Sequence, residues 1–298
     1  MKNLNNHLAM SSIDFFDEVV APKKSPTNDP HRKRRLLGLS ARVSSAYTDY
    51  DSKHSSNTLP SLTQLGVTAT EKEDLLSLYS YNSKKLTEFR NGITTDSSSN
   101  YQSTCQFCTI NSVSSLDHFA PKDDFPEFSV HPHNLLPCCT ECNSKKSKQW
   151  LLNNQHKFLN LYIDKLPTQQ YLFVDLTVIS LNDIEVEFKL DNPHGIPTEI
   201  YSIITSHYNN LELFKRFNEK SGDIITDLSD TIITHLQCEL SINQIKKTTL
   251  LNLQNRKVHK GVNHYQIILE EALMNSKEFL SLFNSFEPTK LTEKKPLE

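Results

Sequence analysis

Two Cys-x-x-Cys pairs constrain this chain more than any other feature of its sequence. Five of the six cysteines lie between Cys105 and Cys142, and Cys238 stands apart. A Cys-x-x-Cys turn directs two thiolates toward one point, and two such turns complete a tetrahedral zinc site. Four sulfur ligands fill the coordination shell, so the predicted zinc is structural rather than catalytic. The predicted ligands are Cys105, Cys108, Cys139 and Cys142.

The second pair leaves one choice of ligand open. Cys138-x-x-x-Cys142 competes with Cys139-x-x-Cys142, and we favour Cys139 because it repeats the spacing of the first pair. The alternative to a metal site is a group of ordinary reduced thiols. Clustered cysteines in a chain without a signal-peptide stretch are more often metal ligands than disulfides.

Composition excludes several classes of function. The net charge of −3 over 298 residues gives no overall attraction to nucleic acid, so phosphate contacts have to come from local basic runs such as residues 31–35 and 145–148. No window approaches the roughly 20 apolar residues that span a bilayer, and a cytoplasmic protein without membrane contact is expected. With six glycines, a glycine-rich nucleotide cradle is not expected either.

Polar residues between and after the cysteine pairs suggest catalysis. Asp117 and His118 are adjacent, and in a continuous strand they would point to opposite faces. Both can reach one substrate only if the strand ends or bends there, which Pro121 permits. Asn134 and Asn143 follow at spacings that allow a hairpin and then a helix to return to the same place.

These residues resemble the HNH endonuclease superfamily, which has the ββα-metal fold. Its pattern is an Asp-His pair followed by proline, a middle Asn-Leu, and a final Cys-x-x-Cys-Asn/His-x-x-Lys between zinc knuckles. The resemblance covers residues 105–149, with asparagine in place of the last histidine, as in the HNN variant. It implies a ββα-metal core with a structural zinc. Together with the periodicity of the flanking segments, this predicts an α+β fold in which the core is embedded in a mainly helical protein that carries an additional β-hairpin.

The resemblance also implies roles for individual residues. His118 would be the general base that takes a proton from water. Asp117 and the side-chain oxygen of Asn143 would hold a single Mg²⁺ or Mn²⁺ ion, because hard oxygen ligands favour these metals. Asn134 would fix the loop that carries His118.

Lysines near this site are the expected contacts to nucleic-acid phosphates. Lys145 and Lys146 lie on the first turns of the helix after the second knuckle, and Lys122 is a weaker candidate. His131 and His133 are read as exposed loop residues rather than ligands, and the neighbouring acidic residues 123, 124 and 127 as a solvated loop.

The rest of the chain divides by its hydrophobic periodicity. Overlapping capping boxes at 68–71 and 70–73 predict a helix over about 70–90, and residues 171–179 and 184–190 predict a β-hairpin. Residues 1–60 are expected to be partly ordered, with short helices at most. The expected organisation is as follows: 1–60 N-terminal region, 61–104 helical lead-in and linker, 105–150 nuclease module, 151–195 hairpin packed on the module, 196–285 helical region, 286–298 flexible tail.

Two classes of function fit these features. The first is a metal-dependent endonuclease that acts on DNA. The second is a non-catalytic zinc ribbon that binds nucleic acid or a protein, which would need the cysteines but not Asp117 or Asn143. The Leu-Asp-His-Phe and Asn-Leu-Leu-Pro-Cys-Cys segments also resemble HNH proteins of Septu-like anti-phage defence systems. That resemblance implies a separate ATPase subunit as partner, and a homo-oligomer is a further expectation.

Overall fold

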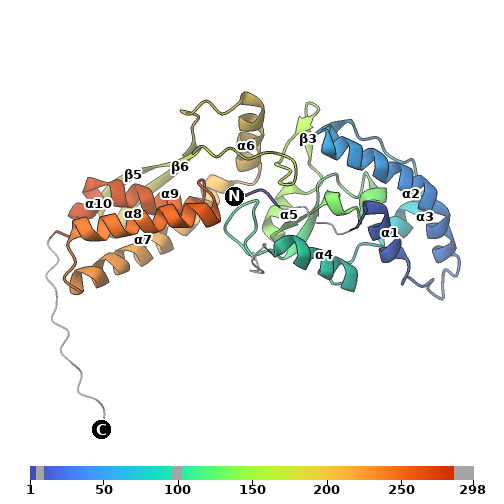
Figure 1. Cartoon of the computed structure of the whole chain (residues 1–298), viewed down its shortest axis with the longest axis horizontal. Coiled ribbons are helices and arrows are strands. Elements are labelled where there is room, and N and C mark those ends of the chain that lie inside the picture. The colour runs from blue at the N-terminus through green and yellow to red at the C-terminus, as the bar shows by residue number, and fades with distance from the viewer. Residues whose placement is uncertain (5–9, 96–102, 285–298) are drawn as a thin grey trace, which may run out of the picture. The chain divides into compact units, whose positions relative to one another are not determined.

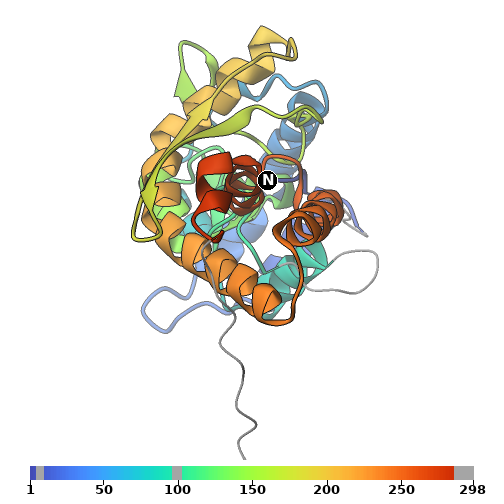
Figure 2. The same cartoon turned by 90° about the vertical axis from the view of Figure 1, so that its left-hand side faces the viewer.

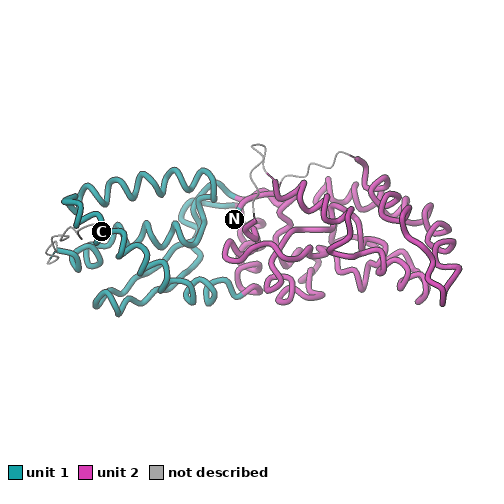
Figure 3. Tube along the Cα trace, turned by 90° about the horizontal axis from the view of Figure 1, so that it is seen from below, with its two compact units in different colours: residues 1, 167–196, 212–298 teal, residues 2–166, 197–211 magenta. Residues whose placement is uncertain are grey.

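The computed structural model describes residues 1–4, 10–95 and 103–284, which form helices and three two-stranded antiparallel sheets (Figure 1). This agrees with the predicted α+β class at that coarse level. The chain divides into two compact units (Figure 3). One contains residues 2–166 and 197–211, and the other contains residues 1, 167–196 and 212–298. The predicted tail at 286–298 lies outside the described residues.

The unit that contains the cysteine pairs has helices and two of the small sheets (Figures 1 and 2). Three short 3-10 turns, η1 to η3, connect some of these elements. In chain order the elements are α1 (Ser12–Val20), α2 (Arg32–Ser55), η1 (Leu59–Ser61), α3 (Ala69–Leu76), α4 (Lys84–Thr94), β1 (Ser115–His118), η2 (Pro126–Phe128), η3 (Pro132–Asn134), β2 (Leu135–Cys138), α5 (Thr140–Lys146), β3 (Leu151–Leu152), β4 (Gln155–His156) and α6 (Thr198–Asn210).

Helix α2 is longer than the sequence led us to expect for residues 1–60. It buries one stripe of residues spaced three or four apart, which is the pattern of an amphipathic helix. Many charged and small polar residues lie between the buried positions, so the sequence of this segment alone predicts only partial order. The buried residues of the stripe are Leu36, Leu39, Val43, Tyr47, Tyr50 and His54.

The helix expected over 70–90 is two helices. The capping box at Thr68 and Glu71 is present as predicted: the Thr68 hydroxyl accepts from the Glu71 N–H, and the Glu71 carboxylate accepts from the Thr68 N–H. Helix α3 ends at Leu76, and α4 begins after a new N-cap at Ser83. The serine-rich connection interrupts the helical pattern because serine side chains compete for backbone groups.

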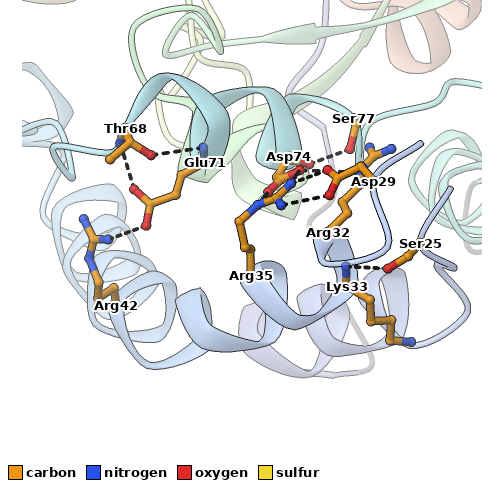
Figure 4. Close-up of polar contacts among 10 residues, drawn as sticks. All are labelled: Ser25, Asp29, Arg32, Lys33, Arg35, Arg42, Thr68, Glu71, Asp74 and Ser77. Carbon is orange, nitrogen blue, oxygen red and sulfur yellow. Dashed lines mark hydrogen bonds and ion pairs between the residues drawn. The ribbon is translucent and has the colours of Figure 1, made fainter. Parts of the chain in front are cut away.

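Ion pairs between α2 and α3 involve the basic run at 31–35 (Figure 4). Arg35 donates two hydrogen bonds to the buried Asp74 carboxylate, at 2.7 and 3.0 Å, and also pairs with Asp29. The Arg32 guanidinium lies 3.5 Å from the same Asp74 carboxylate. Two arginines of this run therefore hold α2 against α3, which leaves them less available to a phosphate than the sequence alone would indicate.

The second unit is built on the predicted hairpin. Strands β5 (Leu172–Ser180) and β6 (Asp183–Leu190) pair antiparallel, with Leu176 opposite Val186. Four helices accompany them (Figure 2): α7 (Leu213–Gln237), α8 (Ile242–Lys260), α9 (Tyr265–Asn275) and α10 (Lys277–Ser281). Strand β5 contacts α9, and β6 contacts α7. The hairpin thus belongs to this unit and not, as expected, to the one that holds the 105–150 module.

Helix α6 follows the hairpin in the sequence but belongs to the cysteine-containing unit. His207 of α6 is completely buried, and its Nε2 donates to the Phe107 carbonyl at 2.8 Å, inside the first cysteine pair. The Nδ1 of the same ring accepts from the Leu159 N–H at 3.3 Å. Helix α6 therefore supports the first knuckle directly.

Among the described residues, no helix combines the length and the apolar character that crossing a bilayer requires.

Candidate functional site

A short hairpin followed by a helix carries the predicted site residues. Strands β1 and β2 pair antiparallel, with Asp117 opposite Leu136 and His118 opposite Leu135. Cys139 caps the N-terminus of α5, where its sulfur accepts from the Cys142 N–H at 3.4 Å. The order β1, β2, α5 is therefore strand, strand, helix, with a cysteine of the second pair at the junction.

The four predicted zinc ligands converge in the structure. The sulfur atoms of Cys105, Cys108, Cys139 and Cys142 lie within 4.8 Å of one another, and all four residues are buried. Backbone N–H groups point at the sulfurs, for example that of Ile110 toward Cys108 at 3.4 Å, which suits thiolates bound to a cation. The cluster could hold a zinc-like metal ion, and the chemistry of the four sulfurs fits such a group.

The choice between Cys138 and Cys139 is resolved by strand geometry. Cys138 is the last residue of β2, and its sulfur lies near the Ser115 hydroxyl at 3.9 Å rather than in the cluster. Cys139 is one residue further and reaches the other three sulfurs. The preferred ligand set is therefore the one that the structure brings together.

Asp117, His118 and Asn143 line one cavity of about 250 Å³. The strand ends at His118, as the adjacent Asp-His pair requires if both side chains are to reach one substrate. Lysines and an aspartate complete the polar part of the wall. The lining residues are Tyr79, Leu116, Asp117, His118, Pro121, Lys122, Asp123, Asn143, Ser147 and Lys148.

Hydrogen bonding fixes the protonation pattern of His118. Its Nε2 lies 2.8 Å from the Ser129 carbonyl, which can only accept, so Nε2 carries the ring proton and Nδ1 keeps its lone pair. Burial lowers the pKa of His118 to about 3, below the near-neutral value that suits a general base. The ring is therefore neutral at pH 7, and a phosphodiester in the cavity would raise this pKa through its negative charge.

Asp117 and Lys146 form a buried ion pair. The two charged atoms lie 3.2 Å apart, and the Lys146 amine also donates to the His118 carbonyl at 2.8 Å. Burial raises the pKa of Asp117, whereas the positive charge of Lys146 opposes this rise and favours the carboxylate. Lys146 is fully buried, so the surface contact to phosphate that we expected of it does not fit its position.

The remaining predicted polar residues lie in and around the cavity. The Asn143 side-chain amide donates to the Ser115 hydroxyl at 2.7 Å, and this bond orients the amide. The Lys122 amine lies over the Tyr79 ring, 4.8 Å from its centre. Lys145 is half-buried on α5 and does not line the cavity, whereas Lys148 does, and it pairs with Asp123 at 2.8 Å.

Asn134 fixes the loop after His118 from a fully buried position. Its side-chain oxygen accepts from the Ala120 N–H at 2.7 Å and from the Tyr50 hydroxyl at 3.0 Å. Its amide donates to the carbonyls of Ala120 and Phe128 at 3.0 and 3.1 Å. All four bonds are internal, as expected of a residue that positions a loop.

Two residues that hold the His118 ring were not predicted from any sequence pattern. Tyr79 packs edge-to-face on this ring with the centres 4.6 Å apart, and its hydroxyl donates to the Leu116 carbonyl at 3.1 Å. Ser129 supplies the carbonyl that orients His118, and its own hydroxyl donates to the Leu75 carbonyl at 2.7 Å. Segments that precede residue 96 and segments that follow residue 102 therefore meet at this ring.

Comparison with known proteins leaves the family open. No protein-family model matches the chain, and no solved structure matches it significantly. The curated proteins include one similar sequence, protein ea31 of Escherichia phage lambda, which is 26% identical over 188 residues. That alignment covers 59% of this chain and 62% of the phage protein, so the chain spans less than two thirds of its relative.

Proposed function

We propose that the chain is a metal-dependent endonuclease of the HNH type, which hydrolyses phosphodiester bonds of DNA. One observation carries the proposal: Asp117, His118 and Asn143 share a cavity on a strand–strand–helix unit whose junction belongs to a four-cysteine cluster. A zinc ribbon that only binds nucleic acid or a protein would need the cysteines. It would have no use for a neutral imidazole beside two oxygen atoms that can bind a metal ion.

The residues would divide the work as follows. His118, held by Ser129 and Tyr79, would accept a proton from water at Nδ1. Asp117 and the Asn143 oxygen supply hard ligands that suit Mg²⁺ or Mn²⁺. Such an ion, when bound, would polarise the scissile phosphate and stabilise the leaving 3′ oxygen, so that a 5′-phosphate results. Lys146 would keep Asp117 ionised and the end of β1 in place.

Substrate binding would rely on the lysines at the cavity. Lys122 and Lys148 line it, and their amines could pair with phosphates on either side of the scissile bond. Lys148 would first have to leave Asp123, an exposed pair of the kind that contributes little stability. Because the net charge is −3, this local patch would have to provide the attraction to DNA.

The test is cleavage of supercoiled plasmid by purified protein with Mg²⁺ or Mn²⁺, with and without EDTA. We expect divalent-dependent nicking by the wild type and at least about a 100-fold lower rate for His118→Ala. His194→Ala is the matched control, because His194 is exposed and lies in the other unit. Zinc content and circular dichroism establish that the variants are folded.

Two results would contradict the proposal. One is a folded, zinc-containing His118→Ala protein that cuts DNA at the wild-type rate. The other is the absence of divalent-dependent cleavage on plasmid, linear duplex, single-stranded DNA and RNA, which would favour a binding module.

An ATPase subunit as partner and a role in anti-phage defence remain predictions from the family resemblance. Purification of the tagged chain from its own host, followed by identification of bound proteins, would test the partner. Recovery without any ATPase would count against it.

A further inference from the structure

A second group of metal-ligating side chains lies apart from the cysteine cluster and from the His118 cavity. Asp51 comes from α2, and His131 and His133 lie at the start of η3 and within it. One ligand atom from each of the three residues lies within 4.8 Å of the others. The sequence suggested exposed loop histidines at 131 and 133, but His131 is completely buried and His133 is 19% exposed.

His131 provides the strongest indication that something binds here. Its buried Nε2 has no hydrogen-bond partner of good geometry among the described residues, although the Tyr47 carbonyl lies close to the ring. This nitrogen points toward Asp51, whose nearest carboxylate oxygen is 3.5 Å away. A buried polar atom without a partner is uncommon, because it has lost its hydrogen bonds to water without replacement. A ligand between Nε2 and the carboxylate would satisfy it.

Asp51 and His133 complete the set of donors. The Nδ1 of His133 lies 2.6 Å from the Asp51 carboxylate, which also accepts from the Ser12 hydroxyl at 3.2 Å. The Asp51 side chain is 36% exposed, so an ion could enter from solvent on this side. His54, one turn after Asp51, stacks parallel on the His133 ring with the centres 4.6 Å apart and limits how far that ring can turn.

We propose that Asp51, His131 and His133 form a second metal site, which takes a divalent transition-metal ion of the Zn²⁺ class. Two imidazoles and one carboxylate are typical ligands of zinc, and they leave a fourth position for water. In a tetrahedral site with bonds of about 2.1 Å, ligand atoms lie roughly 3.4 Å apart, close to the observed distance between Nε2 of His131 and Asp51. Mg²⁺ prefers oxygen ligands only and would bind poorly here.

Two hydrogen bonds change when the ion binds. The short Asp51–His133 bond is replaced by two metal–ligand bonds, and the His133 ring moves slightly away from the carboxylate. Coordination through Nε2 places the ring proton of His131 on Nδ1, which in the metal-free state accepts from the His133 N–H at 3.2 Å. That long hydrogen bond is lost when the ion binds, so the NMR resonance of the His133 backbone amide should change as the site fills.

The proposed site fastens α2 to the loop that carries Asn134. Tyr50 lies between them: its ring packs against His131 with the centres 4.2 Å apart, and its hydroxyl donates to Asn134. An ion at Asp51, His131 and His133 would therefore stabilise the loop that Asn134 holds. The proposal does not depend on nuclease activity, because it concerns only binding and stability.

The experiment measures zinc bound by the full-length protein after loosely bound metal has been removed with a mild chelator. With Mg²⁺ in excess to occupy the oxygen ligands of Asp117 and Asn143, elemental analysis with a competing zinc indicator should give about two zinc ions per chain at saturation. His133→Ala and Asp51→Asn should each retain about one ion and lose at least about tenfold in affinity for the other. The exposed His194→Ala control should behave as the wild type.

Cobalt distinguishes the two sites spectroscopically. Thiolate-to-cobalt charge transfer reports on the cysteine cluster alone, so a second Co²⁺ ion should bind without increasing that absorption. In the wild type only, addition of Zn²⁺ should shift the His133 amide resonance and raise the unfolding temperature. The proposal is overturned if the folded wild type saturates at one ion per chain, or if both folded variants still bind two.

Discussion

Replacement of Asn134 by alanine should strongly destabilise the cysteine-containing unit. Asn134 is fully buried and makes four hydrogen bonds, three to the backbone of residues 120 and 128 and one to Tyr50. Alanine removes all four bonds, although the Phe128 carbonyl still accepts from the His131 N–H and the Tyr50 hydroxyl still reaches the His133 carbonyl. At about 1 kcal/mol for each, the free energy of unfolding should fall by about 4 kcal/mol. That is a large part of the 5–15 kcal/mol typical of a folded domain.

Urea unfolding followed by tryptophan fluorescence measures this loss selectively. Trp150 is the single tryptophan of the chain, and it packs against Phe119 and Phe125 of the same unit. Asn143→Ala is the matched control, because it removes one half-buried bond to Ser115 and should cost about 0.5–1 kcal/mol. A loss below about 1 kcal/mol for Asn134→Ala, or an equal loss for both variants, would refute the reasoning.

Three further predictions concern other parts of the chain. Cys139→Ser should lose the zinc of the cysteine cluster and several kcal/mol of stability, whereas Cys138→Ser should keep both; metal content and Trp150 fluorescence decide this. Asp74→Asn should destabilise by about 2 kcal/mol, because it breaks the contacts of a buried carboxylate with the partly exposed Arg35; equal unfolding midpoints would contradict this. Burial lowers the pKa of the His264 ring to about 3. The folded protein should therefore lose stability as the pH falls from about 6.5 toward 3, because the unfolded chain takes up a proton that the buried ring does not. An NMR titration midpoint of this ring near pH 6.5 would contradict the prediction.

The features that the sequence predicted well depend on local spacing. Two Cys-x-x-Cys turns bring sulfur atoms together almost regardless of what surrounds them, and the four cysteines indeed form one cluster. The capping box at Thr68 and the hairpin at 172–190 are also local and are present. The Asp117-His118 pair required the strand to end there, and it does.

The features that were missed depend on residues distant in the sequence. Lys146 belongs to a basic run and reads as a surface residue, yet the buried Asp117 carboxylate holds it inside the unit. His131 reads as a loop residue, yet the aromatic side chains of α2 cover it. Glu127 likewise reads as solvated, but it is buried and accepts from the Leu65 N–H at 2.8 Å. No periodicity within these segments encodes a partner that arrives from elsewhere in the chain.

The membership of α6 determines how this protein can be dissected. Residues 197–211 lie beyond the hairpin in the sequence, but they complete the cysteine-containing unit through His207 and its bond to Phe107. An expression fragment that stops at residue 166 would leave the Phe107 carbonyl and the Leu159 N–H without their partner. We therefore expect the cysteine-containing unit to be produced as a stable fragment only when residues 2–166 are joined to 197–211 by a linker that replaces the hairpin, and a library of simple C-terminal truncations would miss it.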